Sequence, residues 1–195
     1  ECVCRLLGVE KGAFENALDT GLEFGELALY ESPKREYVYL GEYYRAERYI
    51  SAKIAVMLEY GSFPDVDFRM EIEGIEWSEN IKYEEKQKKA IEECMKNRVF
   101  ILTGGPGTGK TTTLNAVILL CKQRKMKISL AAPTGRAAKR MTDLTGSKAQ
   151  TIHRLLEVDF TRNELAFKHN EQNPLDADVV IIDEMSMVDT LLMES

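Results

Sequence analysis

Residues 104–113, Gly-Gly-Pro-Gly-Thr-Gly-Lys-Thr-Thr-Thr, have the types and the spacing that phosphate binding requires. Gly104, Gly109, Lys110 and Thr111 match the phosphate-loop pattern Gly-x-x-x-x-Gly-Lys-Ser/Thr. Glycines allow several backbone N–H groups to converge on phosphate oxygens, and a helix that starts there adds the positive end of its dipole. The ammonium of Lys110 would contact the β- and γ-phosphates of ATP, and the Thr111 hydroxyl would ligate Mg²⁺. The nucleotide-binding residues expected in this loop are Gly105, Pro106, Gly107, Thr108, Gly109, Lys110, Thr111 and Thr112.

A pair of acidic residues, Asp183-Glu184, follows about 70 residues later, directly after an apolar run of strand length. An acid at the carboxyl end of a strand beside a phosphate loop is where Mg²⁺ needs an anchor, and the next carboxylate is placed to polarise the attacking water. We therefore expect Asp183 to serve the metal together with Thr111. Lys110, Asp183 and Glu184 are the expected catalytic residues.

A second loop lies between these two motifs and lacks the phosphate-loop pattern, so it should serve another ligand. Residues 133–140, Pro-Thr-Gly-Arg-Ala-Ala-Lys-Arg, follow a strand and open a helix. The backbone N–H groups of this loop, the Thr134 hydroxyl and the Arg136 guanidinium suit a phosphate of nucleic acid. Residues 151–156, Thr-Ile-His-Arg-Leu-Leu, come shortly after. His153 either belongs to the same site or is a capping or core histidine.

Strands and helices must position these loops. Short apolar runs predict strands at 98–103, 127–132 and 178–182, and the first of them leads through the phosphate loop into a helix at 114–125. This alternation predicts an α/β fold with a parallel sheet flanked by helices, in which the nucleotide lies at the carboxyl ends of the strands.

Composition limits the class of protein. The chain has 195 residues, of which 44% are apolar and 30% charged, as in globular proteins. Four scattered cysteines are too few for a disulfide scaffold, and two histidines exclude a centre built from several histidines. No apolar run reaches the roughly 20 residues of a membrane helix and no signal peptide opens the chain, so we expect a cytoplasmic protein with no membrane partner.

Charge is unevenly spread along the chain. Residues 1–90 carry a net charge of −7 and residues 91–195 one of +1. Residues 121–140 contain seven Lys and Arg and no acid, which predicts either a patch that attracts phosphate backbones or a solvated helix surface. Four acids fall within 71–80, and we interpret 71–82 as a linker.

The residues before this linker predict a small accessory domain, 1–70, that does not indicate a function. Two strand-like runs, 27–31 and 36–40, flank a turn-prone Ser-Pro-Lys-Arg and predict a β-hairpin. A helix is expected around 13–22, and a longer one after the hairpin. Seven of the eight tyrosines fall between positions 30 and 60, where they either stack on bases or form core and surface.

The motifs together resemble a known family. Residues 104–112, 132–138, 151–156 and 183–189 look, in that order, like motifs I, Ia, Ib and II of RecD-like superfamily 1 DNA helicases, the group of the exodeoxyribonuclease V alpha subunit. Motif II reads Asp-Glu-Met-Ser, whereas helicases of opposite polarity usually show Asp-Glu-Ala-Gln. The resemblance is specific over about 83–195.

This resemblance implies an ATP-driven motor that moves 5′ to 3′ on single-stranded DNA and unwinds duplex DNA in recombination and repair. It implies that Gln87 reads adenine, a role that a side-chain amide can fill, and that 83–195 is the first RecA-like motor domain. The DNA-binding residues it implies are Pro133, Thr134, Gly135, Arg136, Thr151 and His153. The sequence leaves open whether RecB/RecC-like nuclease subunits are partners.

The same resemblance predicts that the chain is a piece of a longer protein. Family members continue past motif II into a second RecA-like domain that supplies an arginine finger, and residues 188–195 look like a helix cut short. Without that arginine a phosphoryl-transfer site can lose about 10³–10⁵ in rate. We therefore expect these residues alone to bind nucleotide weakly and to be nearly inactive.

Two other classes of protein were considered. A signal-recognition-type GTPase shares Gly-Lys-Thr-Thr-Thr but needs Asp-Thr-Ala-Gly and a later Lys-x-Asp, which are absent. A non-enzymatic nucleic-acid-binding module with a vestigial ATP site is disfavoured for the parent protein, because Lys110, Thr111, Asp183 and Glu184 are all intact.

Overall fold

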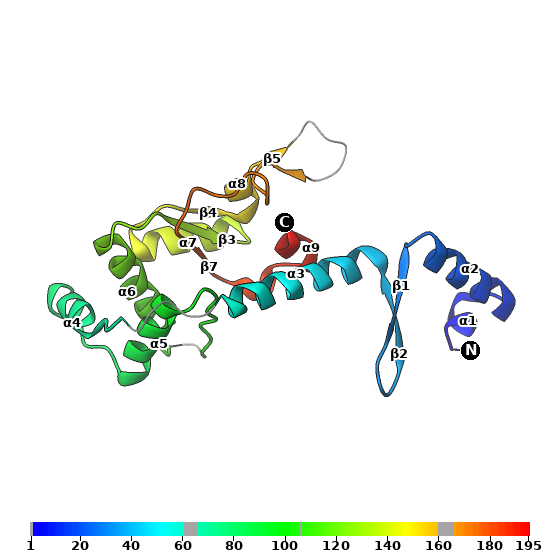
Figure 1. The fold of residues 1–195 in the computed structure, drawn as a ribbon, viewed down its shortest axis with the longest axis horizontal. Coiled ribbons are helices and arrows are strands. Elements are labelled where there is room, and N and C mark those ends of the chain that lie inside the picture. The colour runs from blue at the N-terminus through cyan, green and yellow to red at the C-terminus, as the bar shows by residue number, and fades with distance from the viewer. Residues whose placement is uncertain (1, 61–65, 106, 160–165) are drawn as a thin grey trace. The chain divides into compact units, whose positions relative to one another are not determined.

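The computed structural model describes residues 2–60, 66–105, 107–159 and 166–195. The described residues form two compact units, one from the ranges 1–53 and 189–194 and the other from 54–188 and 195. The long helix α3, Gly41–Glu59, runs from the first range into the second (Figure 1).

The described part of the first unit contains short helices, a hairpin and most of a long helix. Its elements are α1 Cys2–Leu7, α2 Lys11–Glu23, β1 Leu27–Glu31, β2 Glu36–Leu40, most of α3, and α9 Thr190–Glu194. The hairpin pairs Leu27 with Leu40 and Glu31 with Glu36, and the Ser32 hydroxyl closes the turn by donating to the Arg35 carbonyl at 2.8 Å. The hairpin and the helix that follows it confirm the sequence prediction.

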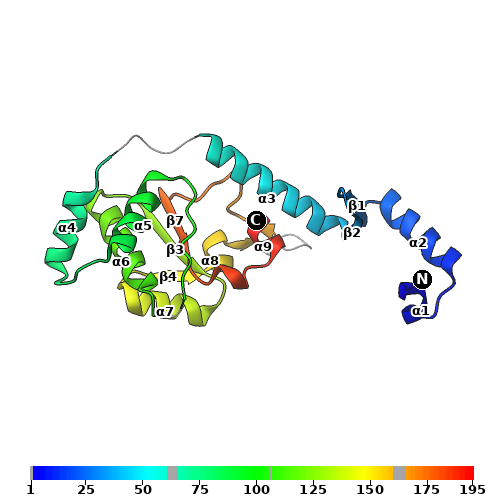
Figure 2. The ribbon, with the colours of Figure 1, turned by 90° about the horizontal axis from the view of Figure 1, so that it is seen from below.

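The second unit is an α/β arrangement around a three-stranded parallel sheet in the order β4-β3-β7 (Figure 2). This confirms the predicted fold class. Strands β3 and β7 match the runs predicted at 127–132 and 178–182. The elements are α4 Arg69–Ser78, α5 Glu85–Lys96, α6 Lys110–Gln123, β3 Ile128–Ala132, α7 Gly135–Thr145, β4 Ala149–Thr151, α8 Ile152–Leu156, β5 Val158–Asp159, β6 Ala166–Phe167, β7 Val179–Ile182 and the 3₁₀ turn η1 Met185–Met187.

The core of this unit holds α6 in place. One cluster packs the buried side chains of α4 and α5 against Ala116, Val117, Leu120 and Cys121 of α6. A second cluster joins Ile118 of α6, Leu130 of β3 and Met141 of α7. Because both faces of α6 are covered, its N-terminus, where the phosphate loop ends, has a fixed position relative to β3 and α7.

The strand predicted at 98–103 is absent from the structure. Residues 100–105 have no regular structure, and the Ile101 side chain is 83% exposed. A strand needs a neighbouring backbone to satisfy its N–H and C=O groups. Among the described residues the ladders of the parallel sheet join only β4, β3 and β7, so this apolar run has no partner.

The segment predicted as a linker, 71–82, is mostly helical. Helix α4 buries Ile72 and Ile75 in the core, and Phe68 just before it is buried too. Three of the four acids that suggested a linker lie at other positions of α4, where Glu71 accepts from Arg124, just after α6, at 2.7 Å. Residues 71–78 are therefore part of the packed core rather than an unstructured connection, while the domain boundaries, with the linker at 71–82, stay a prediction.

Candidate functional site

The phosphate loop enters α6 through a left-handed glycine. Gly109 has φ +80° and ψ +20° and is the residue that precedes the first turn of α6, and Gly107 has φ +74°. Residues with a β-carbon rarely adopt this conformation. The pattern of glycines therefore matches what the backbone needs in order to turn its N–H groups toward one point at the start of a helix.

The side chain of Lys110 folds back over the loop. Its ammonium donates to the carbonyl oxygens of Gly104 and Gly105, the second at 3.0 Å, and the Thr108 hydroxyl donates to the same Gly105 oxygen at 2.9 Å. A β-carbon at Gly104 would approach the Thr108 hydroxyl within 2.7 Å, so the loop is too tight for a larger residue there. Pro106 lies outside the described residues.

Gln87 reaches this loop from α5. Its side-chain oxygen accepts from the backbone N–H of Glu84 at 2.9 Å, in a capping box that starts α5. Its amide nitrogen lies so close to Gly109 that a β-carbon there would collide with it. The structure thus brings together two predicted nucleotide-binding residues that are far apart in sequence.

Three successive threonines at the start of α6 differ in their surroundings. Thr111 is half-buried, Thr112 is exposed, and Thr113 is buried with its hydroxyl donating to the Gly109 carbonyl at 3.1 Å. Sequence reasoning did not single out Thr113, although a threonine in the first turn of a helix can bond back to the carbonyl four residues earlier. It ties the helix to the loop that precedes it.

Asp183 and Glu184 lie at the carboxyl end of β7, as predicted. The Asp183 backbone N–H donates to the Ala131 carbonyl of β3 at 3.0 Å, and its carboxylate accepts from the Glu184 N–H at 2.9 Å. Glu184 has a left-handed backbone, with φ +55°, before η1 begins. Both residues are exposed, so their carboxylates are accessible to a ligand.

The side chain of Glu184 has a partner that sequence reasoning missed. Its carboxylate oxygen is 3.7 Å from a guanidinium nitrogen of Arg140, on α7. Position 140 was recognised only as one cation among several in the basic segment, because nothing in its spacing indicates which acid it faces.

Within the part of the chain that the structure describes, no hydrogen bond or ion pair joins Lys110 or Thr111 to Asp183 or Glu184. The same residues contain no cluster of three His, Cys, Asp or Glu side chains that could hold a metal by itself. The Thr111 hydroxyl and the Asp183 carboxylate are nevertheless oxygen donors of the kind that Mg²⁺ prefers, and it binds through few protein ligands when a nucleotide supplies the others. The donor set therefore fits a magnesium–nucleotide complex.

Two threonines among the residues expected to bind DNA cap helices. The Thr134 hydroxyl oxygen accepts from the Ala137 N–H at 3.2 Å at the start of α7, and Thr151 accepts from the Arg154 N–H at 3.3 Å at the start of α8. Either hydroxyl can still donate its own hydrogen to a phosphate. Of the other residues predicted to bind DNA, Gly135 and Arg136 are exposed, Pro133 is half-buried, and His153 is half-buried with its ring 5.9 Å from that of Phe167.

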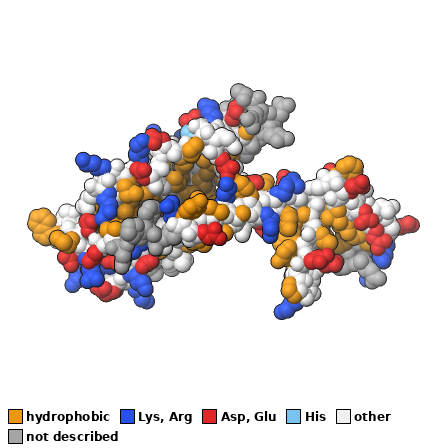
Figure 3. Space-filling model, viewed as in Figure 1, with side chains coloured by type: hydrophobic (Ala, Val, Ile, Leu, Met, Phe, Trp, Pro, Cys, Tyr) orange, Lys and Arg blue, Asp and Glu red, His pale blue; other side chains and the backbone are white. Residues whose placement is uncertain are grey.

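Three of the seven cations in the basic segment 121–140 are paired with acids from distant parts of the sequence. Arg124 bonds to Glu71 and lowers the pKa of that carboxyl, and its guanidinium lies over the Phe68 ring at 4.5 Å. The hydrogen bond from Lys127 to Asp176, at 2.6 Å, raises the pKa of Lys127. In Figure 3 the Lys and Arg side chains on the visible face stand among Asp and Glu rather than in one patch.

The positive charge expected over 121–140 is therefore partly neutralised, because acids remote in sequence face Arg124, Lys127 and Arg140. Arg136 and Lys139, both exposed on α7, have no ion pair among the described residues.

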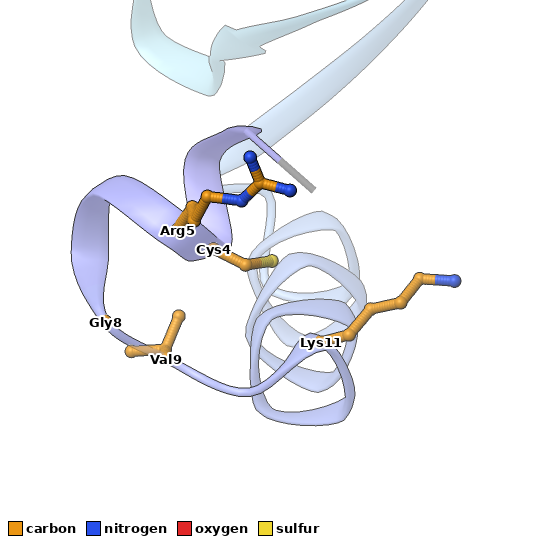
Figure 4. A pocket seen from close by; sticks show the side chains of 5 residues that line it. All are labelled: Cys4, Arg5, Gly8, Val9 and Lys11. Atoms are coloured by element: carbon orange, nitrogen blue, oxygen red, sulfur yellow. The ribbon is translucent and has the colours of Figure 1, made fainter.

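A shallow pocket of about 420 Å³ lies in the first unit, at the turn from α1 to α2 (Figure 4). It is lined by Cys4, Arg5, Gly8, Val9 and Lys11, none of which belongs to the motifs above. Among the described residues, no helix combines the length and the apolar character needed to cross a bilayer.

Comparison with known proteins places the chain in a family. Residues 87–195 match the model of the AAA domain family. The chain is 33% identical over 200 residues to the ATP-dependent RecD2 DNA helicase of Deinococcus radiodurans, an alignment that covers 96% of this chain and 27% of that protein.

Two RecBCD enzyme subunits RecD are also similar. The one from Buchnera aphidicola subsp. Acyrthosiphon pisum is 41% identical over 128 residues, covering 55% of this chain and 21% of the relative. The one from Mycolicibacterium smegmatis is 32% identical over 182 residues, covering 80% and 31%. The chain thus spans about a quarter of the length of these relatives. It belongs to the AAA domain family, and its resemblance to RecD-type helicases is borne out by these relatives.

Proposed function

We propose that this chain is the ATP-binding part of a RecD-type DNA helicase that acts in recombination and repair. The observation that carries the proposal is the convergence of Gln87, left-handed Gly109 and Lys110 at the start of α6. Relatives whose names state DNA helicase or RecBCD subunit activity support the assignment of DNA as the substrate.

Each residue of the nucleotide site has a proposed role. The backbone N–H groups at the start of α6 and the Lys110 ammonium hold the β- and γ-phosphates, and the Gln87 amide recognises adenine. Thr111 and Asp183 would hold Mg²⁺. The bound metal ion would neutralise the charge that develops on the phosphates. Glu184 accepts a proton from the attacking water, for which an exposed carboxylate next to the metal residue is suited.

We propose that DNA binds along the N-terminal ends of α7 and α8. Arg136 is exposed and lacks an ion pair among the described residues, so its guanidinium is available to a phosphate. The remaining DNA contacts in this proposal come from Pro133, Thr134, Gly135, Thr151 and His153.

Movement is proposed to run 5′ to 3′ on single-stranded DNA, as the Asp-Glu-Met-Ser form of motif II suggests. We also propose that residues 1–195 alone hydrolyse ATP too slowly to move, because the resemblance places the arginine finger in a second motor domain. We also propose that the protein works in the cytoplasm. RecB/RecC-like subunits are the partners if the protein is a nuclease subunit, and none is needed if it acts alone.

A strand-displacement assay with the full-length protein tests this proposal. The substrates are duplexes that carry a 5′ tail, a 3′ tail or no tail, each with and without ATP. Release of the labelled strand only from the 5′-tailed duplex, only with ATP, is expected. Release from the 3′-tailed duplex alone would refute the polarity, and no release from any duplex by a protein that hydrolyses ATP would refute unwinding.

A further inference from the structure

The ion pair between Arg140 and Glu184 connects the two sites that the proposed function keeps separate. Glu184 stands at the end of β7, beside the residue expected to hold Mg²⁺. Arg140 stands on α7, the helix that begins at the expected DNA site. Their charged groups are 3.7 Å apart.

The two elements that carry this pair belong to one packed unit. Strand β3 pairs directly with β7, and α7 packs on β3 through Met141 and Leu130. The backbone of Glu184 is held in a left-handed conformation, and its N–H is bonded to Asp183. Because both residues lie in or beside packed elements, we expect the ion pair to form and break through movement of the two side chains.

Arg140 also has a neighbour on the DNA side. The exposed positions of α7 include Arg136, Lys139, Arg140 and Asp143, while Ala138 and Met141 are buried. Arg136 and Arg140 are four residues apart and so lie one above the other on the helix surface. A phosphate held by Arg136 would therefore be close enough for the long side chain of Arg140 to reach.

The ion pair is weak enough for Arg140 to exchange the Glu184 carboxylate for a DNA phosphate. The distance exceeds that of a hydrogen bond, and the side chains of Arg140 and Glu184 are 68% and 43% exposed. Pairs this exposed contribute little, so a DNA phosphate can replace the carboxylate at small cost. While the pair lasts, one oxygen of Glu184 is turned toward α7 and is less available to take a proton from water.

We propose that Arg140 is a positioning residue that restrains Glu184 in the absence of DNA and releases it when a DNA phosphate takes its place. This inference rests on the proposed function, because it needs Glu184 to act on the attacking water and DNA to bind along α7. It makes the rate of ATP hydrolysis, rather than the affinity for ATP, depend on DNA.

The test is steady-state ATP hydrolysis by the full-length protein, with and without saturating single-stranded DNA, for wild type and Arg140→Gln. Without DNA, Arg140→Gln should raise kcat about two- to fivefold, the size that an exposed ion pair permits, and leave the KM for ATP unchanged. With DNA its kcat should stay within about twofold of wild type, so its stimulation by DNA falls. A DNA-free kcat equal to or below that of wild type would overturn the inference.

Three controls separate positioning from other roles. Lys139→Gln removes the adjacent exposed cation and should leave the DNA-free rate unchanged. Arg140→Lys keeps the charge and should restore most of the restraint. In a Glu184→Gln background, Arg140→Gln should have no further effect on kcat. An equal increase for Lys139→Gln would show a general effect of charge and overturn the assignment to Arg140.

The proposed function can fail separately. If wild type hydrolyses ATP at the same rate with and without DNA, coupling to DNA fails whatever the variants do, and the inference fails with it. If wild type is stimulated by DNA but Arg140→Gln behaves like wild type, only the inference fails.

Discussion

The side-chain amide of Gln87 lies against Gly109, and a β-carbon at position 109 would collide with its nitrogen. The oxygen of the same amide accepts from the Glu84 N–H at the start of α5. One side chain therefore fixes the N-terminus of α5 against the end of the phosphate loop. Gly109 is constrained twice, by its left-handed φ of +80° and by this contact.

Gly109→Ala should destabilise the chain by more than the strain of a left-handed residue, which is about 1–3 kcal/mol, because it adds the collision with Gln87. Gly107→Ala is the matched variant, since Gly107 has φ +74° and a β-carbon there would meet nothing within 4 Å. Free energies of unfolding from denaturant titration give the comparison. Adding Gln87→Ala to Gly109→Ala should restore the free energy of unfolding by the amount by which Gly109→Ala is less stable than Gly107→Ala. No such increase would contradict the contact.

Thr134 has a structural role that is separate from its proposed contact with DNA. Thr134→Ala removes the bond to the Ala137 N–H and should cost about 1 kcal/mol of stability, as lost N-caps do. Thr134→Ser keeps a hydroxyl and should lose much less. Thermal unfolding of both variants measures this difference, and a Thr134→Ala variant as stable as wild type would show that the cap contributes nothing.

Cys121 provides a prediction on pH and reactivity. It is fully buried, and burial raises the pKa of its thiol to about 11. Only thiolates react readily, so at pH 8 a thiol reagent should modify Cys121 far more slowly than the partly exposed Cys4. Peptide mapping after timed labelling gives both rates, and denaturant should abolish the difference. Equal rates in the folded chain would contradict the burial.

The same shift predicts how stability depends on alkaline pH. The unfolded thiol ionises near pH 8.5–9, whereas the folded thiol keeps its proton until about pH 11. The contribution of Cys121 is therefore complete below about pH 8.5 and is lost as the pH rises toward 11. Unfolding free energies of wild type and Cys121→Ala, measured from pH 8 to 11, should converge as the pH rises. A constant difference would refute the shifted pKa.

Local patterns predicted the elements that local interactions form. The hairpin at 27–31 and 36–40 has its turn chemistry within the sequence of the turn, where Ser32 bonds to Arg35. Strand β7 is a continuous apolar run and β3 is apolar except for Ser129, which is typical of strands in a parallel sheet. The loop glycines and the acids after β7 were predictable because their types follow from phosphate and metal chemistry.

What the sequence did not reveal depends on partners remote in the chain. The run 98–103 is apolar enough for a strand, but pairing requires a neighbour that the pattern does not specify. Helix α4 was not predicted because its acids suggested a linker, although Phe68, Ile72 and Ile75 have the spacing of one buried helix face. The ion pair of Arg140 with Glu184 joins residues 44 positions apart, and spacing along the chain cannot indicate it.

The central claim is that nucleotide bound at Gly109 and Lys110 drives a motor on DNA. The most direct measurement is the ATPase rate of the full-length protein with and without single-stranded DNA, beside Lys110→Ala and the exposed-lysine control Lys89→Ala. We predict strong stimulation by DNA in wild type and Lys89→Ala, and a rate about 10²–10³ lower in Lys110→Ala, since one charged donor to the transferring phosphate is lost. A rate that DNA does not change, or that survives in Lys110→Ala, would contradict the account.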